Sequence, residues 1–246
     1  LRGGANRHSN FSSPRDIPLS FASGDKKIAE EAIEKTTTYP AGAQPAHVIG
    51  SHDVFRAWQS AGTEAWRYRN AALLQMTMKG SPFLYYGEEL GLRPGSQIVV
   101  DDRDYARTPM PWTRDPNGHG FTPGAPWIGF GEAAAETSVE AEDADPASML
   151  TYYRQLLAFR RGRAVWGAGA LRVVKTDARG LVTFVREDAA SAYLVAVSVV
   201  EEDQEATLPV AAGLARLAFG DGSLAAAGEA SRLRLPARGA AMFQLR

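Results

Sequence analysis

The sequence contains no cysteine among its 246 residues, which excludes disulfide bonds, thiolate metal sites and thiol nucleophiles. Its four histidines do not form a cluster suited to zinc, and no segment has the ligand spacing of an EF-hand calcium loop. No apolar run approaches the roughly 18 residues of a membrane span. We therefore expect no cofactor or metal on this chain and no membrane partner. A cytoplasmic location is expected, although the lack of cysteine does not exclude secretion.

The chain also lacks an excess of either charge. Its 27 Lys and Arg residues balance 28 Asp and Glu residues, for a formal net charge of −1, so we expect no nucleic-acid partner. The composition, 45% hydrophobic and 22% charged, is that of an ordinary globular protein with one large or two modest domains. The first residues, Leu1 to Asn6, include neither an initiator Met nor an apolar signal core, and they resemble the interior of a longer chain.

Short apolar runs alternate with helical patterns through residues 1–164. Polar residues 1–15 are expected to form a loop, and the Gly- and Pro-rich residues 87–145 a second, long loop. The expected elements are strands at 17–21, 47–50 and 81–87, and helices at 25–35, at 63–79 with Thr63 as N-cap, and from Asp145 as N-cap to Gly162. Strands and helices in this order are typical of a parallel sheet built from βα units.

The pattern changes near residue 164. Short apolar runs then follow one another, separated by turn residues and without an intervening helix. The expected strands are 171–174, 181–185, 193–197, 206–208, 214–219, 232–235 and 240–245. This spacing predicts an antiparallel β-sandwich. The chain is thus expected to divide into an α/β part, residues 1–164, and a small all-β domain, residues 165–246.

A polar trio follows the strand that ends at Gly50. Ser51, His52 and Asp53 stand just past the carboxyl end of that strand, where barrel enzymes carry their catalytic groups. Such a His-Asp pair is by itself more often a loop contact than a catalytic pair. A different βα enzyme that uses His52 and Asp53 as a proton relay is an alternative interpretation.

Several segments together resemble the α-amylase family of glycoside hydrolases (family 13), in its α-glucosidase and oligo-1,6-glucosidase branch. Residues 47–53 resemble the motif that ends the seventh barrel strand, and residues 80–91 the eighth-strand signature. Residues 103–112 and 117–122 resemble the long-loop signature of α-glucosidases, and residues 148–160 the eighth barrel helix. The resemblance implies the C-terminal part of a (β/α)8 TIM barrel, strands 6–8, followed by the β-sandwich.

The resemblance also implies roles for individual residues. Asp53 matches the third carboxylate of the family, a transition-state stabiliser that binds the sugar hydroxyls. His52 matches a histidine that hydrogen-bonds the same sugar, and Arg107 an arginine that closes the pocket around the terminal glucose. Arg56 is a further cation near Asp53 in the sequence and is expected to assist substrate binding. The alternative for Arg107 is an ordinary ion pair in a surface loop.

Other conspicuous side chains have weaker implications. Trp112, Phe121 and Trp127 could stack on sugar faces, but aromatic residues in a long loop more often anchor that loop. Glu88 and Glu89 form a tempting carboxylate pair, and the resemblance implies that they are structural.

The resemblance places the nucleophile and the general acid of the family before residue 1. Hydrolysis of a glycosidic bond with retention needs both carboxyl groups. We therefore expect a partial chain that is inactive alone, whose partner is the missing N-terminal half of the barrel and whose substrate is an α-glucoside or short oligosaccharide. Any calcium site of the family would lie in that missing part. A non-catalytic carbohydrate-binding or structural module derived from the same fold is the alternative.

Overall fold

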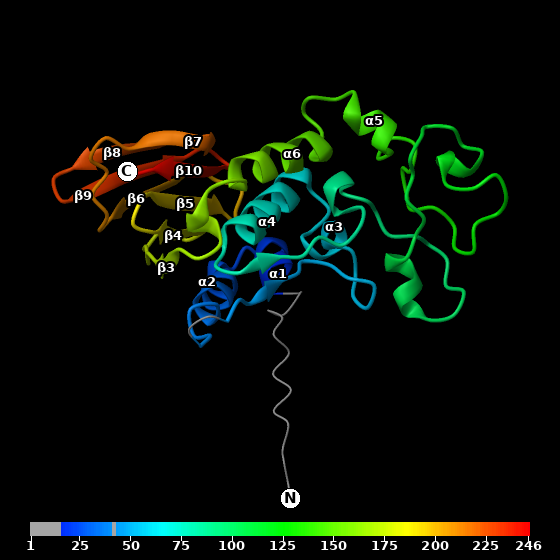
Figure 1. Ribbon diagram of the computed structural model, residues 1–246, viewed down its shortest axis with the longest axis horizontal. Helices are drawn as coiled ribbons and strands as arrows, with labels where there is room; N and C mark the ends of the chain where they lie inside the picture. Colours follow the sequence, from blue (N-terminus) through cyan, green and yellow to red (C-terminus); the bar gives the residue numbers. More distant parts are fainter. Residues whose placement is uncertain (1–15, 41–42) are drawn as a thin grey trace, which may run out of the picture.

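The computed structural model describes residues 16–40 and 43–246, so the loop expected at residues 1–15 lies outside the described residues. Helices occupy the middle of the molecule, between the C-terminal strands and a long green loop (Figure 1). They are α1 (Asp16–Ser23), α2 (Lys26–Lys35), α3 (Ala57–Ser60), α4 (Ala65–Thr77) and α6 (Met149–Arg160). Strands β1 (Ala46–His47) and β2 (Ser81–Pro82) pair in parallel. The expected α/β class is thus observed.

The strand expected at residues 17–21 is wrong, because these residues belong to helix α1. Ile17 and Phe21, four residues apart, are buried on one face, whereas Leu19, which a strand would place beside them, is 48% exposed. Pro18 lies in the first helical turn, where an N–H group has no partner within the helix in any case. The described residues therefore contain two parallel strands, not the three predicted.

Two expected helix caps are also wrong. Thr63 has a left-handed backbone with φ of 62°, and α4 begins after Glu64, whose side chain makes no cap hydrogen bond. Helix α6 begins after Ser148, because the Ser148 hydroxyl accepts the N–H of Thr151 at 3.1 Å. Asp145 stabilises only the preceding turn, in which it accepts the N–H of Ala147 at 2.8 Å.

Strands β1 and β2 are shorter than the sequence predicts. A buried glutamine, Gln75, forms hydrogen bonds with the backbone at their carboxyl ends. The Gln75 amide of α4 donates to the carbonyls of His47 at 3.2 Å and Phe83 at 2.9 Å, so one side chain bridges the two strand ends. Gly80, which precedes β2, has φ of 129°. A Cβ atom there would lie 2.2 Å from the Pro45 carbonyl oxygen, so only glycine fits this close approach.

The long loop, expected at residues 87–145, extends over residues 87–138, before α5 (Val139–Asp143), and points away from the C-terminal strands (Figure 1). It contains short 3-10 helices and leads into a short α-helix, namely η1 (Glu88–Leu90), η2 (Asp102–Ala106), η3 (Gly118–Gly120) and α5 (Val139–Asp143). Residues 83–86 connect β2 with this loop, and Arg103 and Arg107 of the loop contact the segment after β1. The loop therefore supplies side chains to the same edge of the structure as Asp53.

The C-terminal residues form two antiparallel sheets, as expected. After a 3-10 helix η4 (Ala164–Trp166), the strands are β3 (Ala170–Val173), β4 (Leu181–Glu187), β5 (Ala192–Ser198), β6 (Gln204–Leu208), β7 (Arg216–Gly220), β8 (Ser223–Ala227), β9 (Ala230–Leu235) and β10 (Ala240–Gln244). One sheet has the order β3-β4-β5-β10-β7 and the other β6-β9-β8. Leu181 and Leu194 of the first sheet pack with Leu208 and Leu233 of the second in one buried cluster. Strand β8, which is rich in alanine, was not predicted.

The other face of the five-stranded sheet packs against the helices. Phe184 and Val195 of this sheet share one hydrophobic cluster with Phe21 of α1, Leu73 of α4 and Leu156 of α6. Helices α1, α4 and α6 therefore pack against the five-stranded sheet. The division near residue 164 stays a prediction, but the two parts share this hydrophobic core.

Candidate functional site

Asp53 lies in a tight turn that follows β1. The Ser51 hydroxyl accepts the N–H of Asp53 at 3.2 Å, which fixes the turn. The Asp53 side chain is 53% exposed, so its carboxylate is accessible from outside the molecule. Asp53 thus follows β1, which ends at His47, with five residues between them.

Three cationic or titratable side chains surround the Asp53 carboxylate. Arg103 Nη1 lies 3.2 Å and Arg107 Nη2 lies 3.7 Å from Oδ1, while His52 Nε2 lies 3.3 Å from Oδ2. The structure thus brings His52 and Asp53, which are neighbours in the sequence, together with Arg107, which lies 55 residues after His52. Arg103 was not predicted, although it stands within the quoted loop signature.

Arg107 is held from two sides. Its Nε donates to the His52 carbonyl at 3.2 Å, and its Nη1 donates to Asp104 Oδ1 at 3.3 Å. Because the guanidinium plane is rigid, these two anchors orient the remaining nitrogen toward Asp53. Arg107 also makes ion pairs within the loop, with Asp101 and Asp104, as the alternative interpretation of a loop ion pair expects, and its role toward substrate stays a prediction.

Asp104 is the buried anchor of this arrangement and was also missed by sequence reasoning. Its Oδ2 accepts the backbone N–H groups of Val99 at 2.9 Å, Val100 at 2.6 Å and Asp101 at 3.2 Å. These hydrogen bonds, that of Val100 first, lower the pKa of the Asp104 carboxyl. An Asp at the third helical position after an Asp N-cap is the signal that could have identified this capping arrangement.

The neighbouring pair of Asp101 and Arg103 completes the charged cluster. Hydrogen bonds from the Arg103 side chain lower the pKa of Asp101 to about 2. Arg103 therefore connects one carboxylate of the loop with Asp53 on the strand side. Both residues are exposed enough for water to weaken the ion pairs, so their main effect is to set geometry.

The structure corrects the expectation that Arg56 contacts substrate. Arg56 is only 2% exposed, and its guanidinium donates to the carbonyl of Tyr86 at 3.0 Å and to the hydroxyl of Thr108 at 3.1 Å. It also lies over the Tyr85 and Tyr86 rings, 5.4 and 4.9 Å from their centroids. Arg56 thus positions the segments that carry the site, since all its described contacts are internal.

Glu88 is structural in character, as expected. It is 4% exposed, and burial raises the pKa of its carboxyl well above the usual range. A Cβ atom on Gly50 would approach Glu88 Oε1 to 3.0 Å. The Glu88 carboxyl therefore packs directly beneath the turn that presents Asp53.

Two cavities adjoin the charged cluster. A cleft of about 220 Å³ is lined by Asp53, Val54, Phe55, Asp102, Arg103 and Ala106. A second cavity of about 420 Å³, here called the aromatic pocket, is lined by Tyr86, Glu89, Arg107, Pro109, Met110, Trp112, Phe121, Trp127 and Ile128. Arg107 lines the aromatic pocket and lies 3.7 Å from Asp53, which lines the cleft.

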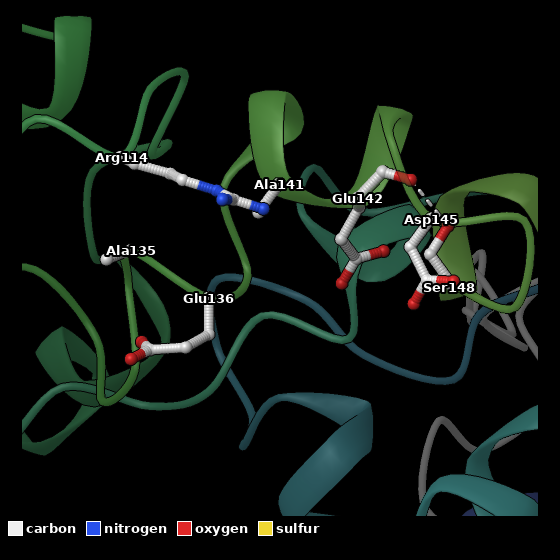
Figure 2. A pocket seen from close by; sticks show the side chains of 7 residues that line it. All are labelled: Arg114, Ala135, Glu136, Ala141, Glu142, Asp145 and Ser148. Carbon is white, nitrogen blue, oxygen red and sulfur yellow. Dashed lines mark hydrogen bonds between the residues drawn. The ribbon is translucent and has the colours of Figure 1, made fainter.

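A third, acidic pocket of about 480 Å³ lies near the start of α6. Figure 2 shows Glu142, Asp145 and Ser148 close together, with Arg114 and Glu136 on the other side. Burial raises the pKa of Glu142 to about 7, and its Oε2 accepts the N–H of Leu150 at 2.9 Å. The Glu142 carboxyl therefore accepts a hydrogen bond from the first turn of α6. Within residues 16–40 and 43–246, no group of three or more His, Asp or Glu side chains could hold a metal ion.

The comparisons with known proteins agree with this architecture. The family described as "Alpha amylase, catalytic domain" matches residues 12–168. The chain therefore belongs to the alpha-amylase family of glycoside hydrolases, as its motifs suggested.

Its relatives include enzymes that act on small sugars. The trehalose synthase of Thermus thermophilus is 30% identical over 198 residues, which are 76% of this chain and 20% of that protein. A probable alpha-glucosidase of Rhizobium meliloti is 31% identical over 181 residues, 66% of this chain and 32% of that protein. The chain thus spans a fifth to a third of the length of these relatives.

Solved structures share the fold. The alpha-amylase of H. orenii has a TM-score of 0.70 and 21% identity, covering 95% of this chain and 48% of that one. The trehalulose synthase MutB of Pseudomonas mesoacidophila has a TM-score of 0.73 and 22% identity, covering 89% of this chain and 46% of that one. An inactive MutB variant was solved in complex with isomaltulose. In the part of the chain that the structure describes, no helix is long and apolar enough to cross a membrane.

Proposed function

We propose that this chain is the C-terminal part of a retaining α-glucosidase-like hydrolase that acts on α-glucosidic bonds of short oligosaccharides. Asp53 stabilises the transition state, and His52 and Arg107 bind the sugar. The nucleophile and the general acid come from residues outside the chain. The observation that carries this proposal is the convergence of Arg107 and His52 on the exposed Asp53 carboxylate, within 3.7 Å.

The charge that develops in the reaction explains why a carboxylate and an arginine would be needed together at this site. A glycosyl transition state develops positive charge at the anomeric carbon and its ring oxygen. A carboxylate held nearby in a fixed position stabilises that charge without reorganising during the reaction. Arg107, anchored by the His52 carbonyl and Asp104, keeps the carboxylate in place, and its remaining N–H groups can donate to sugar hydroxyls.

The test is to supply a matching N-terminal barrel half, as a separate chain or by fusion, and to assay a chromogenic α-glucoside. We expect hydrolysis only by the completed protein, because Asp53 cannot be both nucleophile and proton donor. Clear hydrolysis by the purified 246-residue chain would overturn this assignment of roles. A completed, folded protein that binds glucose without hydrolysing any α-glucoside would favour the carbohydrate-binding alternative.

The role of Asp53 has its own test in the completed protein. Asp53→Asn keeps the shape of the side chain and removes its charge, so we expect turnover to fall by at least a hundredfold, the equivalent of about 3 kcal/mol. Asp177→Asn, at an exposed turn before β4, is the matched control and is expected to leave turnover unchanged. Turnover of Asp53→Asn within about tenfold of the parent would exclude this role.

A further inference from the structure

A cavity of about 640 Å³, here called the α4–sheet pocket, lies between helix α4 and the C-terminal strands. Its lining residues include Trp66, Arg69 and Asn70 of α4, Tyr152 of α6, Asp221 after β7 and Arg238 before β10. The volume falls within the range of roughly 300–1,000 Å³ that small-molecule sites occupy. None of its lining residues lines the aromatic pocket or the cleft at Asp53, so the α4–sheet pocket is a separate cavity.

Contacts between the helices and the sheet fix the walls of this pocket. The Tyr152 ring packs edge-on against Phe219 of β7, with ring centroids 5.6 Å apart, so α6 lies against this strand (Figure 1). Asn70 is only 4% exposed, and its Nδ2 donates to the carbonyls of Ser198 at 3.0 Å and Arg238 at 3.1 Å. The walls are therefore held in place before a ligand binds, which lowers the conformational entropy that binding costs.

The walls carry hydrogen-bonding atoms that the protein leaves unused. Within residues 16–40 and 43–246, every hydrogen bond of the Asn70 side chain uses Nδ2, so Oδ1 remains free to accept. In the same part of the chain, Trp66 Nε1 and Arg69 Nε are buried donors without a partner. Buried polar groups nearly always have a partner, so these atoms favour a bound molecule that supplies one. A hydroxyl group suits both kinds of atom, because it donates and accepts.

The charged residues of the pocket balance one another. Glu64 and Asp221 contribute two carboxylates, and Arg69 and Arg238 contribute two guanidinium groups, so the formal charges of the lining residues sum to zero. Recognition of an anion or a cation needs an excess of the opposite charge in the site. The balance therefore favours a neutral ligand that both donates and accepts hydrogen bonds.

Arg238 occupies a turn position that usually belongs to glycine. Its φ is 62°, and it is the third residue of a turn in which the Gly239 N–H donates to the Pro236 carbonyl at 2.9 Å. Glycine adopts this left-handed backbone without strain. The Arg238 guanidinium pairs with Glu201, but both side chains are nearly half exposed, and such pairs contribute little to stability. A strained residue with a long side chain at this wall thus favours a use beyond the ion pair.

We propose that the α4–sheet pocket binds a neutral sugar at a second site, separate from Asp53. The sugar hydroxyls donate to Asn70 Oδ1 and to the Asp221 carboxylate, and they accept from Trp66 Nε1 and from the Arg238 guanidinium. The ring of Trp66 adds apolar area for the C–H groups of the sugar. This proposal does not rest on the proposed function, because no catalytic group takes part in it.

The experiment measures maltose binding to the 246-residue chain by calorimetry and NMR. The chain carries Asp53→Asn and Arg107→Ala, which weaken any sugar binding beside Asp53, and we expect maltose still to bind. Adding Trp66→Phe and Asp221→Ala should weaken this binding at least tenfold, because the first removes a donor while keeping a ring and the second removes an acceptor. Asp177→Ala, at an exposed turn before β4, is the matched control and should change nothing. Circular dichroism checks that each variant is folded.

Three results would overturn the proposal. The first is that maltose does not bind, or stops binding once Asp53 and Arg107 are replaced. The second is an affinity that Trp66→Phe and Asp221→Ala leave unchanged. The third is binding of glucose 1-phosphate without binding of maltose, which would make the pocket an anion site.

The proposed function fails separately. If the completed protein hydrolyses no α-glucoside but maltose affinity still depends on Trp66 and Asp221, the second site stands and the catalytic assignment falls. If hydrolysis occurs and these two residues do not affect maltose binding, the catalytic assignment stands and the second site falls.

Discussion

Arg186 of β4 is the side chain whose replacement should affect stability most clearly. It is fully buried, and its guanidinium donates to the carbonyls of Thr77 at 2.7 Å and Val165 at 2.6 Å. It also donates to the carbonyls of Gly169 at 3.1 Å and Ala170 at 3.2 Å. One side chain of the sheet thus ties together the end of α4 and the segment before β3.

The expected loss follows from two opposing effects. Each of the four carbonyl contacts is a hydrogen bond to a charged donor, worth about 2 kcal/mol. Burial, and next to it the charge of Arg160, lower the pKa of Arg186 to about 9, so keeping the guanidinium charged offsets part of this gain. We therefore expect Arg186→Met, which fills similar space without donors, to lower the free energy of unfolding by about 3 kcal/mol.

Urea unfolding followed by circular dichroism at pH 7 measures this change. With a slope of about 2 kcal/mol per molar urea, the midpoint should fall by about 1.5 M. Arg234→Met is the control, because Arg234 is 59% exposed and forms an ion pair with the equally exposed Glu205, and it should lower the free energy of unfolding by less than about 1 kcal/mol. Indistinguishable losses for the two variants would refute the reasoning.

Three further outcomes are expected. Burial raises the pKa of Glu142 to about 7, so the folded state holds this proton more tightly than the unfolded state. The free energy of unfolding should therefore fall by up to about 2 kcal/mol as the pH rises from 5 to 8. Glu142→Gln should flatten this pH dependence in unfolding experiments. Gly80→Ala should lower the free energy of unfolding, measured by thermal unfolding, by about 3 kcal/mol. Gly228→Ala is the control and should lower it by about 1 kcal/mol, because Gly228 has a left-handed φ but open space around it. In the completed enzyme, Arg107→Ala should raise KM for a small glucoside several-fold, and an unchanged KM would contradict its role.

The sequence predicts the fold where local pattern and tertiary structure agree. Helices α2 and α4 and most strands of the C-terminal sheets follow from periodicity and turn residues. Residues 17–21 were misassigned because an alternating pattern over five residues also fits a short helix, and only packing against α4 decides. The cap of α6 at Ser148 depends on competition between two good capping residues, which sequence alone cannot rank.

The same limit applies to the site. Asp53, His52 and Arg107 were identified through motifs, and the structure brings them together. Arg56 was misjudged because its closeness in sequence does not reveal the direction of its side chain, which points inward to Tyr86 and Thr108. Arg103 reaches Asp53 from 50 residues away, and no local pattern encodes a contact at that separation.

The distribution of the hydrophobic clusters has a consequence for how this chain can be divided and recombined. A breakpoint near residue 164 would separate Phe184 and Val195 from the helices they pack against and leave an apolar face on both products. Chimeras between relatives should therefore exchange the sheets together with α4 and α6. Neither cluster includes a buried residue from positions 79–148, a stretch that the structure describes completely. Insertions and deletions in the long loop can thus be accommodated while the hydrophobic core stays the same.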